Sequence, residues 1–447
     1  MLEKLREKFT YTQTIVLSFV LIILIGSLLL SLPIATANGQ PTPILNAMFT
    51  ATSATCVTGL VIYDTFTHWS TFGHIVILCL IQIGGLGFMS LVTMISVFRG
   101  KRIGIYERRL LMQSEGNLRL SGVVKLLKRI IIGTFSFELI GAVLLSFRFC
   151  QEFGFSRGIF FSVFHSISAF CNAGFDLMGV ESPFSSLTNF HNDPLVCITL
   201  MFLIVIGGLG FLVWNDILNF KFDFKKYSLH SKIVFATTFI ISAASILLFL
   251  IFEDKNLLNG LSIDEKLLKA AFLSISPRTA GFNTLDLTQL SSGSEILTII
   301  LMFIGGSPGS TAGGIKITTV AVLFIFTLAT ARHNTHPEIF KRSIPIDTLK
   351  QASSIFFLYI SAVIVSTTLI ATFENSDISN ILFEAVSAIG TVGLSKGLTP
   401  TLSGISKLVL MMLMFGGRVG GLSLFLSLAE KKVNAPVDRP KENVIVG

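Results

Sequence analysis

The sequence predicts an all-α polytopic membrane protein of four helix–re-entrant loop–helix repeats around a pseudo-fourfold axis, with eight transmembrane helices and four re-entrant loops. Three observations predict this fold. Hydrophobic residues make up 51% of the 447 residues and charged residues only 13%, against roughly 25% charged residues in a typical soluble domain. Eight segments are long and apolar enough to cross a bilayer, and a glycine motif recurs four times. This composition excludes a soluble enzyme, a disordered chain and a secreted disulfide-stapled domain.

The predicted spans follow from length, because a helix needs about 20 apolar residues to cross a hydrocarbon core of ~30 Å. They are residues 14–32, 71–98, 130–147, 194–214, 233–252, 296–331, 351–373 and 408–429. No small-residue cleavage site follows the first run, so we expect a retained span rather than a signal peptide. The loops 1–13, 99–129, 221–232, 332–350 and 430–447 hold 24 of the 34 Lys and Arg residues. This bias predicts that these loops and both termini are cytoplasmic.

Each of the four remaining loops contains a shorter apolar stretch of 10 to 13 residues, namely 44–54, 158–170, 267–276 and 378–389. These stretches are too short to span the membrane. A helix that enters and leaves on the same side fits this length, and a helix lying flat at the interface is the alternative. Four copies at matching positions favour the re-entrant interpretation.

A glycine follows each short stretch, and these four glycines, Gly59, Gly174, Gly281 and Gly393, are spaced 115, 107 and 112 residues apart. Upstream, a phenylalanine and a serine keep a spacing of four in Phe49/Ser53, Phe164/Ser168, Phe272/Ser276 and Phe383/Ser387; downstream, glycine pairs recur at 84–85, 207–208, 305–306 and 416–417. The third repeat is one residue shorter, where Pro277 is expected to end the helix early. We therefore divide the chain into an N-terminus (1–13), repeat 1 (14–98), a basic loop (99–129), repeat 2 (130–220), repeat 3 (231–331), repeat 4 (351–429) and a tail (430–447).

Four glycine strands around one axis predict a ring of carbonyl oxygens at membrane depth, where non-helical backbone is tolerated only if protein buries it or it lines water. Glycine reaches the dihedral angles that turn carbonyls inward and brings no Cβ to the axis. The re-entrant helices would also aim partly negative C-termini at the centre. Such a ring can replace the hydration shell of a monovalent cation, so the axis is a candidate pore. Its candidate filter residues are Cys56, Val57, Thr58, Gly59, Cys171, Asn172, Ala173, Gly174, Arg278, Thr279, Ala280, Gly281, Gly390, Thr391, Val392 and Gly393.

At these residues the sequence resembles the Trk/Ktr/HKT superfamily of potassium transporters, most closely the membrane subunit of the bacterial Ktr system. The resemblance covers residues 12–430. It rests on the set Thr58-Gly59-Leu60, Asn172-Ala173-Gly174-Phe175, Thr279-Ala280-Gly281-Phe282-Asn283 and Val392-Gly393-Leu394. The first repeat starts close to the N-terminus, which favours the Ktr type over the larger Trk type.

The resemblance implies potassium uptake across a bacterial cytoplasmic membrane, stimulated by or coupled to sodium, with K⁺ held by the carbonyls at Gly59, Gly174, Gly281 and Gly393. Glycine rather than serine at position 59 favours potassium. It also implies a homodimer with one pore per protomer and a cytosolic ring of regulatory subunits that carry the nucleotide, so that no covalent cofactor is expected on this chain. Membrane lipid is an expected partner and nucleic acid is not. A sodium-selective or poorly selective channel of the same fold is the alternative.

A glycine-rich stretch interrupts the second helix of repeat 3, because helix does not persist through so many glycines and a proline. Its residues are Gly305, Gly306, Ser307, Pro308, Gly309, Ser310, Thr311, Ala312, Gly313 and Gly314. A passive kink is the alternative, but ten residues are more than a kink needs, and the other repeats have only a glycine pair. The resemblance implies an intramembrane gate here, below the filter. Lys316 and Arg418 are candidate gate residues that line the pore below the filter, because a charge at that depth faces water or a partner. Snorkelling of each side chain to the interface is the alternative.

For several polar residues near the filter the sequence leaves two possible roles open. Arg278 is expected to point behind the filter, since a guanidinium in a cation pore is unfavourable. Asn172 either faces the pore or braces the filter, His165 and Glu384 pack or brace, and Glu138 packs or pairs with a buried cation. The basic loop serves topology alone, or it docks a regulatory subunit or anionic lipid through Arg99, Lys101, Arg102, Arg108, Arg109 and Arg119.

A membrane-embedded enzyme is the main alternative of another class. Its one tight cluster of candidate groups, His191-Asn192-Asp193, lacks metal-ligand partners at helical spacing. The five cysteines, Cys56, Cys79, Cys150, Cys171 and Cys197, lack zinc or redox spacing and are expected to be small apolar fillers. No enzymatic activity is therefore expected.

Overall fold

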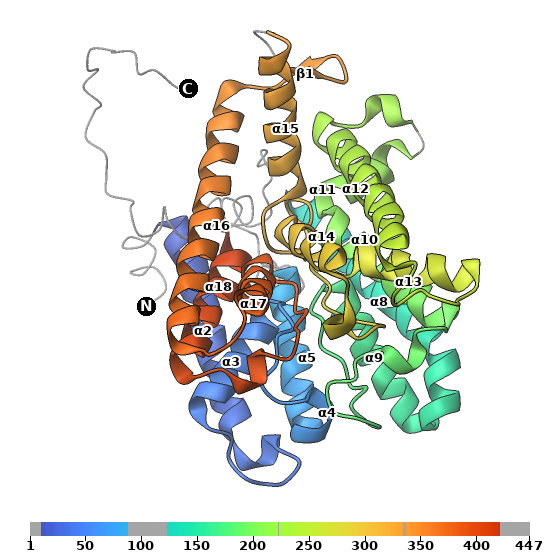
Figure 1. The fold of residues 1–447 in the computed structure, drawn as a ribbon, viewed down its shortest axis with the longest axis vertical. Coiled ribbons are helices and arrows are strands. Elements are labelled where there is room, and N and C mark those ends of the chain that lie inside the picture. The colour runs from blue at the N-terminus through green and yellow to red at the C-terminus, as the bar shows by residue number, and fades with distance from the viewer. Residues whose placement is uncertain (1–9, 88–122, 222, 334–336, 421–447) are drawn as a thin grey trace.

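A computed structural model describes residues 10–87, 123–221, 223–333 and 337–420. These residues form helices and loops with one short hairpin (Figure 1). Residues 1–9 of the predicted N-terminus, the predicted tail at 430–447 and the basic loop up to residue 122 lie outside the described residues. The six arginines and lysines named above for that loop are therefore outside them too.

Repeat 1 begins with α2 (Tyr11–Ser31), whose N-terminus is closed by a capping box between Thr10 and Gln13. The 3₁₀ turn η1 (Pro33–Ala35) leads to the re-entrant α3 (Ile44–Thr55), and the short α4 (Thr65–His68) leads to α5 (Thr71–Leu86). With 12 residues, α3 is about 18 Å long. That is well short of a hydrocarbon core of ~30 Å, as the re-entrant interpretation requires.

Repeat 2 contains α8 (Val123–Phe153), the re-entrant α9 (Phe155–Phe170), η2 (Thr188–Phe190), α10 (Pro194–Leu209) and α11 (Phe211–Phe220). The predicted span at 194–214 is not one straight helix, because α10 and α11 meet at an angle of 93°. The bend falls at Gly210, whose φ of +92° lies in a region that side-chain-bearing residues rarely adopt.

Repeat 3 contains η3 (Phe224–Lys226), α12 (Leu229–Glu253), the re-entrant α13 (Ile263–Ile275), η4 (Leu287–Gln289), α14 (Ser292–Phe303) and α15 (Ile317–Ala331). Helix α13 ends two residues before Pro277, as expected from the sequence. A hairpin of β1 (Glu338–Ile339) and β2 (Arg342–Ser343) follows α15. Repeat 4 contains α16 (Ile346–Phe373), the re-entrant α17 (Ile378–Gly390), η5 (Thr399–Thr401) and α18 (Gly404–Val419).

Four helices of the described residues are long and apolar enough to cross a membrane, and they lie in the first helices of the four repeats: Thr12–Ser31, Val124–Phe153, Leu229–Glu253 and Ile346–Phe373. The bent pair of α10 and α11 is a fifth candidate. The remaining second helices are shorter within the described ranges. Helix α5 ends at Leu86 and α18 at Val419, next to undescribed residues, and α14 and α15 are separated by the glycine-rich loop.

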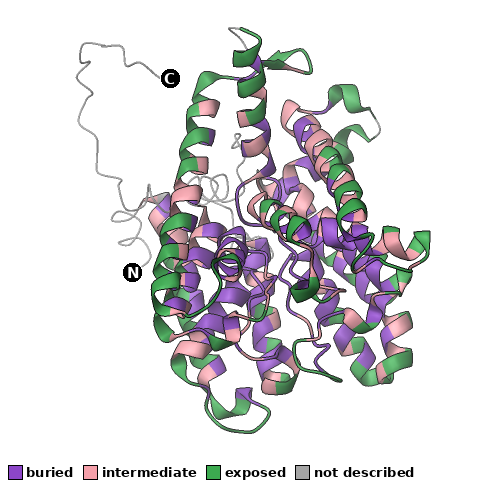
Figure 2. Cartoon of the chain, viewed as in Figure 1, coloured by how far each residue is buried: buried purple, intermediate pink, exposed green. Residues whose placement is uncertain are grey.

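Two hydrophobic clusters meet where the re-entrant helices gather. One joins repeats 1 and 2 and takes in Phe272 and Phe282 of repeat 3. The other joins repeats 3 and 4 and takes in Phe49 and Leu60 of repeat 1. Figure 2 shows the buried residues at the centre and exposed residues along the outer helices. The exposed residues include many large apolar side chains, as expected for helices that face lipid rather than water.

The cysteine prediction is right for three of the five positions. Cys56, Cys171 and Cys197 are buried free thiols, Cys150 is half-buried and Cys79 is exposed.

Candidate functional site

The filter strands share an unusual backbone that begins where each re-entrant helix ends. In every repeat a residue with positive φ is followed, two positions later, by a glycine with positive φ. The pairs of φ values are 57° and 93° for Val57 and Gly59, 58° and 69° for Asn172 and Gly174, 73° and 80° for Thr279 and Gly281, and 51° and 93° for Thr391 and Gly393. Such values are uncommon outside glycine. Their recurrence at matching positions means that four segments far apart in the sequence adopt one conformation.

The four strands close into a ring. A Cβ added at Gly59 would lie 2.5 Å from the Ala173 carbonyl oxygen, and one added at Gly174 would lie 2.7 Å from that of Ala280. A Cβ at Gly281 would in turn meet the carbonyl of Val392, and one at Gly393 that of Thr58. Each glycine therefore faces the carbonyl that precedes the glycine of the next repeat, and the fourth repeat returns to the first. Only glycine fits these positions, because both the contacts and the dihedral angles exclude a side chain.

The serines of the phenylalanine–serine motif hold the strands from behind. Ser53 accepts a hydrogen bond from the Gly59 amide at 3.0 Å, and Ser387 accepts one from the Gly393 amide at 3.1 Å. In repeats 2 and 3 the serine donates instead, from Ser168 to the Phe175 carbonyl at 2.7 Å and from Ser276 to the Phe282 carbonyl. The sequence revealed the spacing of these serines but not their role. The phenylalanines of the motif are buried core residues in all four repeats.

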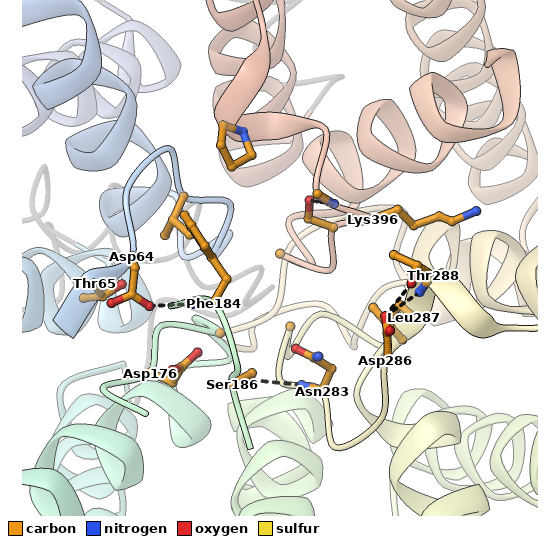
Figure 3. Close-up of a pocket in the computed structure, with 18 residues that line it drawn as sticks. Asp64, Thr65, Asp176, Phe184, Ser186, Asn283, Asp286, Leu287, Thr288 and Lys396 are labelled. Carbon is orange, nitrogen blue, oxygen red and sulfur yellow. Dashed lines mark hydrogen bonds between the residues drawn. The ribbon is translucent and has the colours of Figure 1, made fainter. Parts of the chain in front are cut away.

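A cavity of about 470 Å³ opens above the ring and is lined by its four glycines. Figure 3 shows Asp64 and Asp176 on one side of it, with Asp286 and Lys396 on the other. Lys396 forms an ion pair with Glu295 at 2.9 Å, so its charge is already compensated. Burial raises the pKa of Asp176 to about 6, whereas the Thr288 hydroxyl, first among several donors, lowers the pKa of Asp286. At neutral pH the cavity is therefore acidic and attracts cations.

Below the ring, α14 ends at Phe303 and α15 begins at Ile317, so the non-helical loop is slightly longer than the predicted 305–314. Its two ends meet through a bond from the Gly305 amide to the Ile315 carbonyl at 2.8 Å. The loop also enters the break between α10 and α11. The Ser307 amide donates to the Gly208 carbonyl at 3.0 Å, and the Phe211 amide donates to the Gly309 carbonyl at 2.6 Å.

Arg418 fastens this loop to another repeat. Its guanidinium donates to the Thr311 carbonyl and to the carbonyls of Gly84 and Gly85, the last at 3.0 Å. All three acceptors are backbone carbonyls. The Lys316 ammonium donates to the Ala312 carbonyl at 2.6 Å. Both cations line a second cavity, of about 260 Å³, on the far side of the loop from the filter.

The second helices hold a signal that the sequence analysis missed. Three residues after Gly84, Gly207 and Gly417 stand further glycines, Gly87, Gly210 and Gly420, with φ of 80°, 92° and 92°. Each stands directly after the last residue of an α-helix, so α5, α10 and α18 all end at such a glycine. The Gly-x-x-Gly spacing was visible in the sequence. The first glycine of each set also has a packing role, since a Cβ at Gly84, Gly207 or Gly417 would meet the carbonyl of Thr55, Phe170 or Ile389 near the end of its own re-entrant helix.

Asn172 and Arg278 do not point into the ring. The Asn172 amide donates to the Thr279 hydroxyl at 3.0 Å and accepts from the Thr311 hydroxyl at 3.3 Å, so it braces the filter. Arg278 points behind the filter, as expected, where it donates to the Ser242 hydroxyl on α12 at 3.1 Å.

Three further polar residues brace neighbouring segments. Glu384 accepts from Ser395 at 2.5 Å and from Thr399 at 2.7 Å. His165 contacts the Phe161 carbonyl at 2.7 Å through Nδ1 and accepts from the Leu177 amide at 3.3 Å. Glu138 accepts from the Gln82 amide at 3.0 Å and lies beside Cys171. Among the residues that the structure describes, no cluster of three or more His, Cys, Asp or Glu side chains is arranged to hold a metal.

This arrangement defines a class: an α-helical, multi-pass membrane protein whose four pore-loop repeats enclose one axis. The chain belongs to the family described as "TrkH: Cation transport protein", which matches residues 5–435. This match confirms the predicted family and fold class.

Relatives match along the whole chain. It is 40% identical to the potassium/sodium uptake protein NtpJ of Enterococcus hirae, over 100% of this chain and 99% of that protein. It is 39% identical to the Ktr system potassium uptake protein B of Bacillus subtilis, over 98% and 97%. The crystal structure of the potassium transporter TrkH from Vibrio parahaemolyticus has the same fold, with a TM-score of 0.72 at 16% identity, over 92% of this chain and 84% of that one.

Proposed function

We propose that this chain is the ion-conducting subunit of a potassium uptake system, and that K⁺ crosses the membrane through the four filter strands of a single chain. The closure of the ring carries this proposal, because Gly59, Gly174, Gly281 and Gly393 each face a carbonyl of the next repeat. Carbonyl oxygens held in such a ring replace the hydration shell of a monovalent cation. The names of the two relatives above, both uptake proteins for potassium, support the choice of ion.

The residues around the ring suggest a path with three stages. The acidic outer cavity concentrates cations, the ring removes their water, and the loop at 304–316 closes the path beneath. In the closed state Arg418 holds the loop through the Thr311 carbonyl, and its charge, together with that of Lys316, opposes a cation below the filter. The loop can move at low cost, because single hydrogen bonds rather than a helix ladder attach it to α10 and α11.

Partners and location complete the proposal. The chain acts as a homodimer with one pore per protomer, in the cytoplasmic membrane of a bacterium, with both termini inside the cell. A cytosolic nucleotide-binding ring biases the gate through α15, which runs directly from the loop to the β1–β2 hairpin. The relative from Bacillus subtilis is named as part of a Ktr system, which supports a multi-subunit assembly. Sodium stimulates uptake, and the nucleotide belongs to the partner.

A second candidate is a sodium-selective or poorly selective cation channel of the same fold. The name of the Enterococcus hirae relative, a potassium/sodium uptake protein, favours keeping it. The two candidates differ in one measurable quantity, the ratio of potassium to sodium flux.

The test is ion uptake into proteoliposomes that contain the purified full chain, under matched K⁺ or Na⁺ gradients. We expect K⁺ uptake well above Na⁺ uptake, and a lower ratio for Gly59→Ser, whose side chain would meet the Ala173 carbonyl. Gly39→Ser is the control, because Gly39 also has positive φ, +70°, but has nothing within 4 Å of an added Cβ. Equal K⁺ and Na⁺ uptake by the parent favours the second candidate. A ratio unchanged by Gly59→Ser contradicts the filter.

A further inference from the structure

The loop beneath the filter also touches the filter itself. The Thr311 hydroxyl has two acceptors within hydrogen-bond distance, which share its one hydrogen: the Phe170 carbonyl oxygen at 3.1 Å and the Asn172 side-chain oxygen at 3.3 Å. On the other side, a Cβ added to Gly313 would meet the Thr391 hydroxyl. The loop therefore contacts the two repeats that flank its own, each at the residue with positive φ where the filter strand begins.

Asn172 extends this contact into the third filter strand. While its oxygen accepts from Thr311, its nitrogen donates to the Thr279 hydroxyl at 3.0 Å. Asn172 and Thr279 are both fully buried, and both are the positive-φ residues of their strands. An amide side chain offers a donor and an acceptor at fixed geometry, and asparagine also tolerates this backbone conformation. One side chain thus joins the loop, filter strand 2 and filter strand 3.

We propose that Asn172 is a specificity-determining residue that couples the loop to the filter through Thr311 and Thr279. The proposal rests on the proposed function, in which the loop is the gate. When the loop is docked, Thr311 fixes the Asn172 amide, and the amide fixes the backbone on either side of the ring. When the loop leaves, the Asn172 oxygen loses this partner and strands 2 and 3 are free to relax.

The coupling has a reciprocal consequence. If docking of the loop changes the affinity of the filter for an ion, an ion in the filter changes the docking of the loop by the same factor. One hydrogen bond of ordinary strength limits that factor to about two- to tenfold. The gate is then a device that responds to which ion occupies the filter, in addition to any regulatory partner.

Thr311→Val tests the coupling, because it removes the hydroxyl at nearly constant volume. Thr311→Ser keeps the hydroxyl and removes only the methyl group. Ser310→Ala is the matched control, since the Ser310 hydroxyl donates to the Ser307 carbonyl within the loop, at 2.6 Å, rather than to the filter. The measured quantity is the ratio of K⁺ to Na⁺ flux in proteoliposomes that contain the full chain. This ratio does not depend on how many molecules are open.

We expect Thr311→Val to change the flux ratio about two- to tenfold, Thr311→Ser to keep it, and Ser310→Ala to keep it even where total flux changes. If Thr311→Val raises the flux and leaves the ratio at the parental value, the gate stands and the coupling is refuted.

A second measurement covers variants that do not conduct. K⁺ and Na⁺ each raise the thermal unfolding midpoint of a chain that binds them, so the difference between the two shifts reports filter preference directly. A difference changed by Thr311→Val and kept by Ser310→Ala supports the coupling. A difference that is the same in both variants and the parent refutes it. If neither ion stabilises the parent chain and neither is transported by it, the proposed function is contradicted instead.

Discussion

The filter and the loop beneath it differ in how often the chain builds them. The filter is built four times, with the same pair of positive-φ residues in each repeat and the same contact from glycine to neighbouring carbonyl. Within the described residues the loop is built once, in repeat 3. It is fastened by Arg418 of repeat 4, whose counterparts in repeats 1 and 2 are Gly85 and Gly208. Four equivalent filter strands surround a spherical ion with similar carbonyl contacts on all sides. A gate needs only one element that moves, so symmetry there is dispensable.

The repeats on either side of the loop hold it in place through different bonds. The loop occupies the break between α10 and α11 and accepts Arg418 across the axis. Repeat 1 receives the other two bonds of the guanidinium, at the Gly84 and Gly85 carbonyls. All four second helices therefore meet at the gate, although only one of them supplies the loop. The four repeats therefore share their backbone conformation at the filter but differ in the side chains that surround the gate.

The largest expected effect comes from breaking one copy of the filter. Gly281→Ala places a methyl group against the Val392 carbonyl and adds strain at a φ of +80°. We expect K⁺ uptake to fall by about a hundredfold or more, because the clash and the strain together cost several kcal/mol at the ion path. Gly260→Ala is the control, with a similar φ of +74° and open space around it. Similar losses in both variants would mean that strain alone, not the ring, is responsible.

The next effect comes from shortening the element that is built once. Deletion of residues 309–311 removes the Arg418 contact at Thr311 and the Phe211 contact at Gly309. We expect basal K⁺ flux to rise about tenfold or more, since bonds to a charged group contribute roughly 1.5–3 kcal/mol, and dependence on the regulatory subunit to fall. Flux and regulation that both stay at the parental level in a folded deletion variant would show that the gate lies elsewhere.

The smallest expected effect is on the outer cavity, where the repeats differ in charge. Asp176 has a pKa of about 6, raised chiefly by burial. It is therefore ionised at pH 7, and it becomes neutral as the pH falls to 5. We expect the apparent K⁺ affinity to weaken about two- to fivefold over this range, because one negative charge beside the path is lost. The Asp176→Asn variant should have, at both pH 7 and pH 5, the weak K⁺ affinity that the parent chain shows at pH 5. A pH dependence that persists in this variant would assign it to another group.

Much of this fold follows from the sequence, because its strongest signals are local. Hydrophobic length predicts the long first helix of each repeat, and the spacing of Gly59, Gly174, Gly281 and Gly393 predicts the repeat. The break at Gly210 was missed although its signal was present, since a single added glycine is a weak mark within an apolar run.

The contacts of the site were less predictable, because they join repeats far apart in the chain. The choice of the Thr311 carbonyl by Arg418 depends on where three repeats meet. The brace at Asn172 depends likewise on Thr279 and Thr311, more than a hundred residues away. The serine bonds even change direction between repeats, with Ser53 accepting and Ser168 donating, although the motif is the same.

The central claim, that one chain encloses a complete pore, is tested most directly by locating the ion. Rb⁺ substitutes for K⁺ and can be located by anomalous diffraction from crystals of the full protein. We expect one Rb⁺ site on the pore axis of every copy of the chain. The carbonyls of Thr58, Ala173, Ala280 and Val392 of that same copy should surround it. Density found only between two copies, with none inside the four strands of a single chain, would contradict it.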